Sequence, residues 1–304
     1  MWSSLRRDSR HALGQRHALT MVAAGVVLYA AGPVLIGSGD ASGPVLSFWR
    51  LWFGVATLGL AAAIGIRMGA RRPGWQGWRW ALWGGLAFGA HQLLFFSAIR
   101  AAGVTDVVLM NVLTPIFVAF AAVPLFGERT SVRFRLWSLL AMAGAALVIT
   151  GGAAGPDGSP AGMAMAVANV VMFGSYFLIS KLGREQIDVL PFLFGSLVVA
   201  AIAVSAWCVM LDEPVGSPTS WDLRVALLLA VGPGGLGHFA MTWPLKWVPA
   251  NVPPVMRLVQ PVISGGLAWA LLAEPITLAH LGGGTLTFLG VFGSMRARPP
   301  SRPG

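Results

Sequence analysis

Residues 189–210 read VLPFLFGSLVVAAIAVSAWCVM, an apolar run without a charged side chain. A hydrocarbon core about 30 Å thick needs about 20 apolar residues in a helix, so this run can cross a bilayer. Helices are expected because backbone polar groups in lipid must pair within the chain. Similar runs lie at residues 18–36, 44–66, 80–99, 107–126, 134–151, 161–180, 224–243, 250–273 and 277–295. The sequence therefore predicts an all-α membrane protein with about ten transmembrane helices.

The composition of the chain argues against a soluble protein. Of its 304 residues, 56% are hydrophobic and 11% are charged, whereas about 25% of a soluble domain is charged. The net charge of +10 could indicate nucleic-acid binding, but the basic residues are spread among short segments between apolar runs. This placement favours anionic lipid over nucleic acid as the partner. The single cysteine, Cys208, allows no disulfide within the chain and no cysteine-based metal site.

The distribution of basic residues predicts the orientation. If the N-terminus is cytoplasmic, 17 of the 21 Lys and Arg residues fall in cytoplasmic segments and 2 in outer segments, while Arg50 and Arg257 lie within spans. The positive-inside rule then predicts a multi-pass protein of the inner or plasma membrane, with cytoplasmic tails at residues 1–17 and 296–304. The arginine-rich start followed by an apolar run also fits a signal peptide. The later spans favour an uncleaved first helix.

The chain contains an internal repeat. Residues 113–116 (LTPI) match residues 259–262 (VQPV), and residues 125–128 (LFGE) match residues 271–274 (LLAE) at the same offset. The predicted domains are a first repeat at 18–151, an outer linker at 152–160 and a second repeat at 161–295. Each repeat has five spans, so the second enters the membrane from the opposite side. Secondary transporters commonly have such inverted repeats, with the substrate site near the midplane.

At these residues the sequence resembles the EamA-like members of the drug/metabolite transporter superfamily. The resemblance is carried by residues 95–100 (FFSAIR), 113–117 (LTPIF) and 126–129 (FGER), and in the second half by residues 258–261 (LVQP) and 271–275 (LLAEP). It implies ten helices in two five-helix repeats. It also implies export or exchange of small metabolites, with no cofactor.

Two arginines inside predicted spans are the strongest candidates for substrate binding. Arg50 and Arg257 lie well within apolar runs, and no acidic residue lies in any predicted span. A charged side chain within a membrane is costly and usually faces the protein interior or a cavity. Their planar donor groups suit a substrate carboxylate or phosphate. The alternatives are snorkelling to the lipid headgroups or bonding to backbone carbonyls.

Other polar residues within the spans extend this candidate site. His91 and His238 titrate near neutral pH and could carry a coupling proton, or they could be packed histidines. The remaining candidates are Asn111 and Thr114 in the fourth span, Asn169 and Tyr176 in the sixth, and Gln260 beside Arg257. Such side chains either line a cavity or bond neighbouring helices together.

Paired prolines and acids occupy matching positions in the two repeats. Pro115 and Pro261 remove a backbone donor and can kink their helices, which would suit gating or static packing equally well. Glu128 and Glu274 follow the fourth and ninth spans. We expect structural roles for both acids, as caps for the next helix.

These features predict a secondary transporter that exports or exchanges a small metabolite by alternating access. The substrate would be an amino acid or a related, anionic compound, driven by a proton gradient or by a counter-substrate. The alternatives are a membrane-embedded enzyme or a membrane scaffold. No HExxH or GxSxG motif supports an enzyme. Both monomer and homo-oligomer remain open.

Overall fold

The structure is a computed structural model that describes residues 17–68, 74–128, 130–152, 159–264, 266 and 277–297. All regular secondary structure in these residues is helical, which confirms the predicted all-α class. Seven helical segments are long and apolar enough to cross a membrane. They are His17–Ser38, Gly43–Arg67, Trp75–Ala102, Val132–Thr150, Pro160–Gly183, Val189–Met210 and Ser220–Lys246.

The labelled elements follow the chain in this order. After residues 17–30, which are helical, come α2 (Gly32–Ser38), α3 (Gly43–Arg67), α4 (Trp75–Asn111), α5 (Thr114–Phe126), α6 (Val132–Gly152), α7 (Pro160–Gly183) and α8 (Val189–Met210). The rest of the described chain forms α9 (Ser220–Val231), η1 (Gly232–Gly237), α10 (His238–Thr242), η2 (Trp243–Lys246), α11 (Val252–Met256), η3 (Arg257–Val259) and α13 (Leu278–Ala297). The predicted span 189–210 has the bounds of α8.

Two predicted spans are not uniform α-helices, although 224–243 lies within the candidate span Ser220–Lys246. For span 107–126, α4 continues to Asn111 and α5 begins only at Thr114, after a turn. For span 224–243, α9 ends at Val231 and the π-helix η1 follows. The sequence of η1, GPGGLG, explains this break, because proline lacks a backbone donor and glycine adds little helix propensity.

Several other predictions cannot be compared in full. The predicted span 250–273 is described only to residue 264 and at residue 266, where it is broken into α11, η3 and a further helical turn. The predicted tails and the linker lie almost entirely outside the described residues, and so does Glu274.

Side-chain caps mark where several helices begin. The Ser42 side chain accepts a hydrogen bond from the Val45 backbone N–H at the start of α3, and Ser159 accepts one from Gly162 at the start of α7. In α9, Thr219 and Asp222 form a capping box. These contacts satisfy backbone donors that a helix leaves free at its N-terminus.

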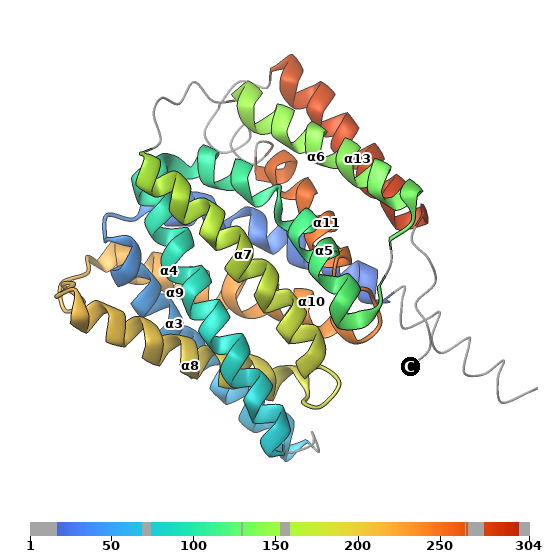
Figure 1. The fold of residues 1–304 in the computed structure, drawn as a ribbon. Helices are drawn as coiled ribbons and strands as arrows, with labels where there is room; N and C mark the ends of the chain where they lie inside the picture. Colours follow the sequence, from blue (N-terminus) through green and yellow to red (C-terminus); the bar gives the residue numbers. More distant parts are fainter. Residues whose placement is uncertain are drawn as a thin grey trace, which may run out of the picture.

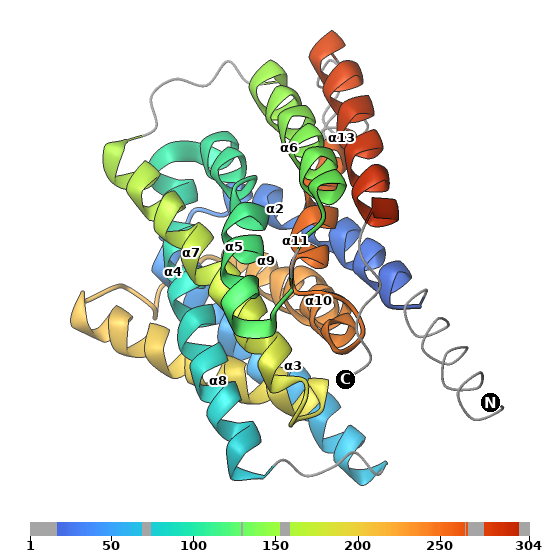
Figure 2. The ribbon, with the colours of Figure 1, turned by 45° about the vertical axis from the view of Figure 1, so that its right-hand side comes forward.

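Helices from the two halves of the chain lie side by side. Figures 1 and 2 both show α6 beside α13 at one edge of the molecule, where they are in extensive contact. Elsewhere α4 packs on α7 and α8, and α3 packs on α8 and α9. The core between these helices contains Phe88, Phe177 and Leu193, together with the buried cysteine Cys208.

Glycines allow α6 and α13 to approach closely. A Cβ atom at Gly144 of α6 would lie 2.5 Å from the backbone nitrogen of Thr287. A Cβ atom at Gly290 of α13 would collide with the backbone of Ala141. Ser138 and Ser294 add a hydrogen bond of 3.1 Å between the same helices. Small residues at the contact are the usual means by which membrane helices pack.

Candidate functional site

A cavity lies between helices from both halves of the chain. It has an empty volume of about 470 Å³, its open mouth included. The first half contributes Tyr29, Arg50 and His91 to its wall, and the second half contributes His238 and Arg257. The structure therefore brings both predicted arginines and both predicted histidines to one cavity.

Arg50 enters the cavity from the first turns of α3 and is 3% exposed. Its guanidinium carbon lies 5.1 Å from the centre of the Phe88 ring, in a cation–π contact. Its Nη2 atom lies against η1, where a Cβ atom at Gly234 would collide with it. Its Nη1 atom is buried and has no hydrogen-bond partner in the described part of the chain. Arg50 therefore keeps an unused donor beside the cavity.

Arg257 begins η3 and reaches the same cavity from the other half of the chain. Its Nε–H donates to Gln260 Oε1 at 3.0 Å, and Gln260 Nε2 donates to the Tyr29 carbonyl at 3.1 Å. The guanidinium carbon lies 4.5 Å from the centre of the Phe173 ring. Nη1 of Arg257 is also buried without a partner among the described residues. The side chain is thus held in place with one donor unused.

His91 belongs to a chain of polar side chains that joins α4 to α7. Its Nδ1 atom and Asn169 Oδ1 share a short hydrogen bond. Asn169 Nδ2 donates to Asn111 Oδ1 at 2.9 Å. Asn111 ends α4, whereas His91 lies near the middle of the same helix and Asn169 lies on α7. The interpretation of these asparagines as interhelical links fits these contacts, and Asn111 also lines a second cavity.

His238, in the wall of the same cavity, bonds to a different partner. Its Nδ1 atom lies 2.9 Å from the Tyr29 hydroxyl. Its ring meets the Phe88 ring edge-on, with 4.6 Å between ring centres. Neither buried histidine has a carboxylate partner in the contacts of the described chain. Both histidines therefore rest against neutral polar groups and aromatic rings.

The second cavity adjoins the first at Arg257 and Gln260. Its empty volume is about 370 Å³, and Thr114 and Pro261 are in its wall. Pro115 lies in the first turn of α5, directly after the break that follows Asn111. Pro261 lies two residues after the end of the 3-10 turn η3. Each proline thus lies next to a departure from regular α-helix, and its role in gating stays a prediction.

Not every predicted residue reaches a cavity, and some cavity residues were not predicted. Tyr176 is buried at 1% exposure and packs on Phe88, with 5.0 Å between ring centres, outside both cavity walls. Tyr29 and Gln92 line the main cavity but were not singled out. Tyr29 carried a usable signal, since it is one of only 2 tyrosines and lies in an apolar run.

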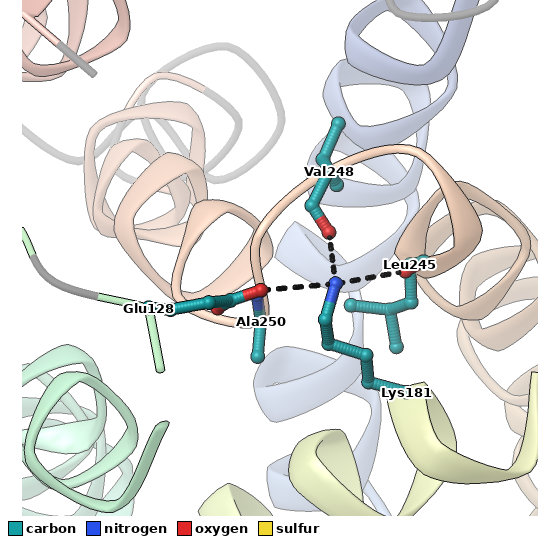
Figure 3. Close-up of polar contacts among 5 residues, drawn as sticks. All are labelled: Glu128, Lys181, Leu245, Val248 and Ala250. Atoms are coloured by element: carbon teal, nitrogen blue, oxygen red, sulfur yellow. Dashed lines mark hydrogen bonds and ion pairs between the residues drawn. The ribbon is translucent and has the colours of Figure 1, made fainter. Parts of the chain in front are cut away.

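Glu128 holds together three segments at one end of the molecule. Its carboxylate lies 3.1 Å from Lys181 Nζ and accepts a 3.0 Å hydrogen bond from the Ala250 backbone N–H. Figure 3 shows Lys181 Nζ between this carboxylate and the carbonyl oxygens of Leu245 and Val248. At the start of α6 the Ser131 hydroxyl accepts from the Phe134 N–H, so Ser131 makes the capping contact there. The structural role expected for Glu128 stays a prediction. We call the group Glu128, Lys181, Leu245, Val248 and Ala250 the clasp.

Comparisons with known proteins agree with this architecture. The model of the EamA-like transporter family matches the chain twice, at residues 16–150 and 160–296. The chain therefore belongs to the EamA-like transporter family, as the resemblance of its motifs implied. It is a multi-pass membrane protein of a class that moves small molecules rather than one known for catalysis.

Two curated relatives are transporters. The aromatic amino acid exporter YddG of Ancylobacter novellus is 27% identical over 214 residues, which cover 68% of this chain and 72% of the relative. An uncharacterized transporter of Archaeoglobus fulgidus is 25% identical over 197 residues, or 65% and 69% of the two chains. A protein of known crystal structure has a TM-score of 0.74 and 22% identity, covering 92% of this chain and 97% of its own. This last likeness shows a common fold.

Proposed function

We propose that this protein is a secondary transporter, an exporter or exchanger, of a small metabolite that carries an anionic group. The substrate would be an amino acid or a related compound. The observation that carries the proposal is the pair Arg50 and Arg257, which line one cavity from opposite halves of the chain. The guanidinium fork is suited to a carboxylate or a phosphate. The relative named as an aromatic amino acid exporter supports a small metabolite as the substrate.

We propose further that ten crossings form two inverted five-helix repeats. In such a fold, a contact between one helix of the first half and another helix of the second half is repeated. The repeated contact is made by the equivalent helices of the opposite halves. The contact of α4 with α8 has such a counterpart in the contact of α9 with α3. The contact of α5 with α7 has its counterpart in the contact of residues 260–264 with the first helical segment. There Gln260 donates to the Tyr29 carbonyl, and Ser264 donates to the Ala30 carbonyl. In the pairs α3–α8 and α6–α13, each helix contacts its own equivalent in the other half. This reciprocity supports the inverted arrangement.

The proposed transport cycle is alternating access in the plasma membrane, with both termini cytoplasmic. The excess of Lys and Arg in the segments assigned to the cytoplasm supports this orientation. In this orientation the clasp closes the cytoplasmic side, since it ties the end of α5 and the end of α7 to residues 245–250. Opening toward the cytoplasm would require the clasp to separate.

Coupling would use either a proton or a counter-substrate. His91 and His238 both line the cavity and could take up a proton during the cycle. Exchange of one anion for another is the second route, since it returns the cavity to the same charge. A dependence of transport on a pH gradient, measured with and without substrate inside the vesicles, separates these two routes.

A transport assay with purified protein in liposomes tests the proposed function. Vesicles are loaded with unlabelled amino acids, their 2-oxo acids or their N-acyl derivatives, and entry of the labelled compound is followed. A carrier is expected to give saturable counterflow for at least one of these compounds. Counterflow should fall about tenfold or more in Arg257→Gln, because the loss of a charge-assisted bond costs about 1.5–3 kcal/mol. Absence of counterflow for every compound would refute the proposal.

A further inference from the structure

The charge of the main cavity is not balanced. Arg50 and Arg257 both line it, and no Asp or Glu is among the described residues of its wall. Both side chains are tied into the fold, Arg50 against η1 and Arg257 through Gln260. Burial of a charge without a partner is costly, so a ligand that brings negative charge is strongly favoured here.

The unused hydrogen-bonding groups at this cavity are donors. Nη1 of Arg50, Nη1 of Arg257 and Nε2 of Gln92 are all buried without a partner in the described chain. By contrast, the side-chain oxygen of Gln260 in the same wall already accepts from Arg257. The cavity therefore offers donors to a ligand, and an anionic oxygen is the acceptor that matches them best.

An ammonium group would find few places in the same cavity. Aromatic faces can hold a cation, but Arg50 already faces the ring of Phe88, and Arg257 faces the rings of Phe173 and Tyr29. A further positive charge would also lie close to two guanidinium groups. The Phe95 ring stacks on the His91 ring and meets the Phe96 ring edge-on. Both rings are in the cavity wall, where their remaining apolar surface suits a flat apolar group of the ligand.

We propose that the substrate is a net anion with an aromatic or flat apolar body, and that zwitterionic amino acids are poor substrates. This inference rests on the proposed function and narrows it to related compounds whose amino group is absent or acylated. The carboxylate binds between Arg50 and Arg257, and the apolar body lies against Phe95 and Phe96. No counter-charge for an ammonium group is present in the described cavity wall.

Three compounds with the same benzyl group test the charge preference directly. They are N-acetyl-L-phenylalanine, which is an anion, L-phenylalanine, which is a zwitterion, and 2-phenylethylamine, which is a cation. Binding to the purified full chain is measured by calorimetry, and transport is measured by counterflow in liposomes. We expect the anion to bind at least about tenfold more tightly than the zwitterion, and the cation to bind least.

Arginine variants show whether the two guanidinium groups cause the preference. In Arg50→Gln and Arg257→Gln, the ratio of anion to zwitterion affinity should fall toward one. The matched control is Arg224→Gln, because Arg224 is exposed and outside the cavity wall, so the ratio should not change. A thermal-unfolding curve of each variant, which does not depend on ligand, shows that the protein is folded.

The outcomes separate this inference from the proposed function. If L-phenylalanine binds and counterflows as well as its N-acetyl derivative, the anion preference is wrong while the carrier function stands. A preference that persists in both arginine variants also overturns the inference, since another group must then cause it. If none of the three compounds binds or counterflows, the inference is overturned. The proposed function is then tested separately by counterflow of the amino acids, 2-oxo acids and N-acyl derivatives described above.

Discussion

At the scale of single residues, we expect Arg257 to lower the stability of the protein when the cavity holds no ligand. Its buried Nη1 donor has no partner in the described chain, and such a group costs about 1–3 kcal/mol. We expect Arg257→Met to raise the thermal stability of the ligand-free protein, because Met keeps the apolar contact with Phe173. The same variant should lose the stabilisation that N-acetyl-L-phenylalanine gives the parent protein. Differential scanning fluorimetry in detergent measures both effects.

Arg224→Met is the control for this prediction, because it removes an exposed arginine outside the cavity. Surface substitutions of this kind usually change stability by less than about 0.5 kcal/mol. A lower melting temperature for ligand-free Arg257→Met than for Arg224→Met would show that Arg257 stabilises the empty protein. In that case its role would be structural.

The ion pair of the clasp is a second residue-scale feature with a measurable consequence. The side chains of Lys181 and Glu128 are 15% and 20% exposed, so water screens the pair only in part. Glu128→Gln removes the charge and weakens the bond to the Ala250 N–H. We expect amide hydrogen exchange in residues 244–252 to accelerate about tenfold, which corresponds to about 1.4 kcal/mol.

Glu185→Gln is the matched control for the clasp, since Glu185 is an exposed acid at the same end of the molecule. Its amide exchange should match that of the parent protein. Equal exchange in Glu128→Gln and Glu185→Gln would mean that the clasp does not hold these segments together.

At the scale of elements, the π-helix η1 positions Arg50. A Cβ atom at Gly234 would collide with Arg50 Nη2 and would lie 2.5 Å from the Leu229 carbonyl oxygen. Gly234→Ala should therefore displace the guanidinium and weaken anion binding about tenfold or more. Gly232→Ala is the control in the same element, because its Cβ atom would meet nothing within 4 Å. Equal affinities in the two variants, measured by calorimetry, would contradict this role of η1.

The contact between α6 and α13 depends on glycine in the same way. The methyl group of Gly290→Ala would overlap the backbone of Ala141, so the helices must separate. We expect a loss of about 1–3 kcal/mol in stability, as for other overpacked contacts. In Gly282→Ala the added methyl group meets nothing within 4 Å, and the melting temperature should not change. A smaller effect at Gly290 than at Gly282 would refute the close packing.

Helix length and type were predictable from the sequence, but breaks within helices were not. Hydropathy alone gave the bounds of α8 and nearly those of α3, since each apolar run ends at polar or charged residues. Hydropathy does not report where the backbone leaves α-geometry, so the break after Asn111 was missed. The break at η1 had a signal in its run of glycine and proline, which the prediction of span 224–243 did not use.

The charged part of the candidate site was predictable, whereas its aromatic part was not. Arg50 and Arg257 are conspicuous because a charge within an apolar run is rare. Phe88 looks like an ordinary core residue of its apolar run, and only the fold shows that its ring faces Arg50. Tyr29 is conspicuous as a rare tyrosine, but only the fold shows that its ring faces Arg257. The partner of Glu128 was also hidden, because Lys181 is distant from it in the sequence.

At the scale of the whole molecule, the account depends on two oppositely inserted halves that enclose the charged cavity. The repeat of sequence motifs and the reciprocal helix contacts both support this arrangement. In an inverted pair, matching loops lie on opposite sides of the membrane. The segment at residues 129–135 would then be cytoplasmic, and its counterpart at residues 274–280 would face outward.

Cysteine labelling in intact cells tests this arrangement most directly. Single cysteines are placed in residues 129–135 or 274–280 of a Cys208→Ala background, and a membrane-impermeant maleimide is added from outside. Label should reach residues 274–280 in intact cells, and residues 129–135 only after the membrane is opened. Labelling of both segments from the same side would contradict the inverted repeat and the alternating-access mechanism built on it.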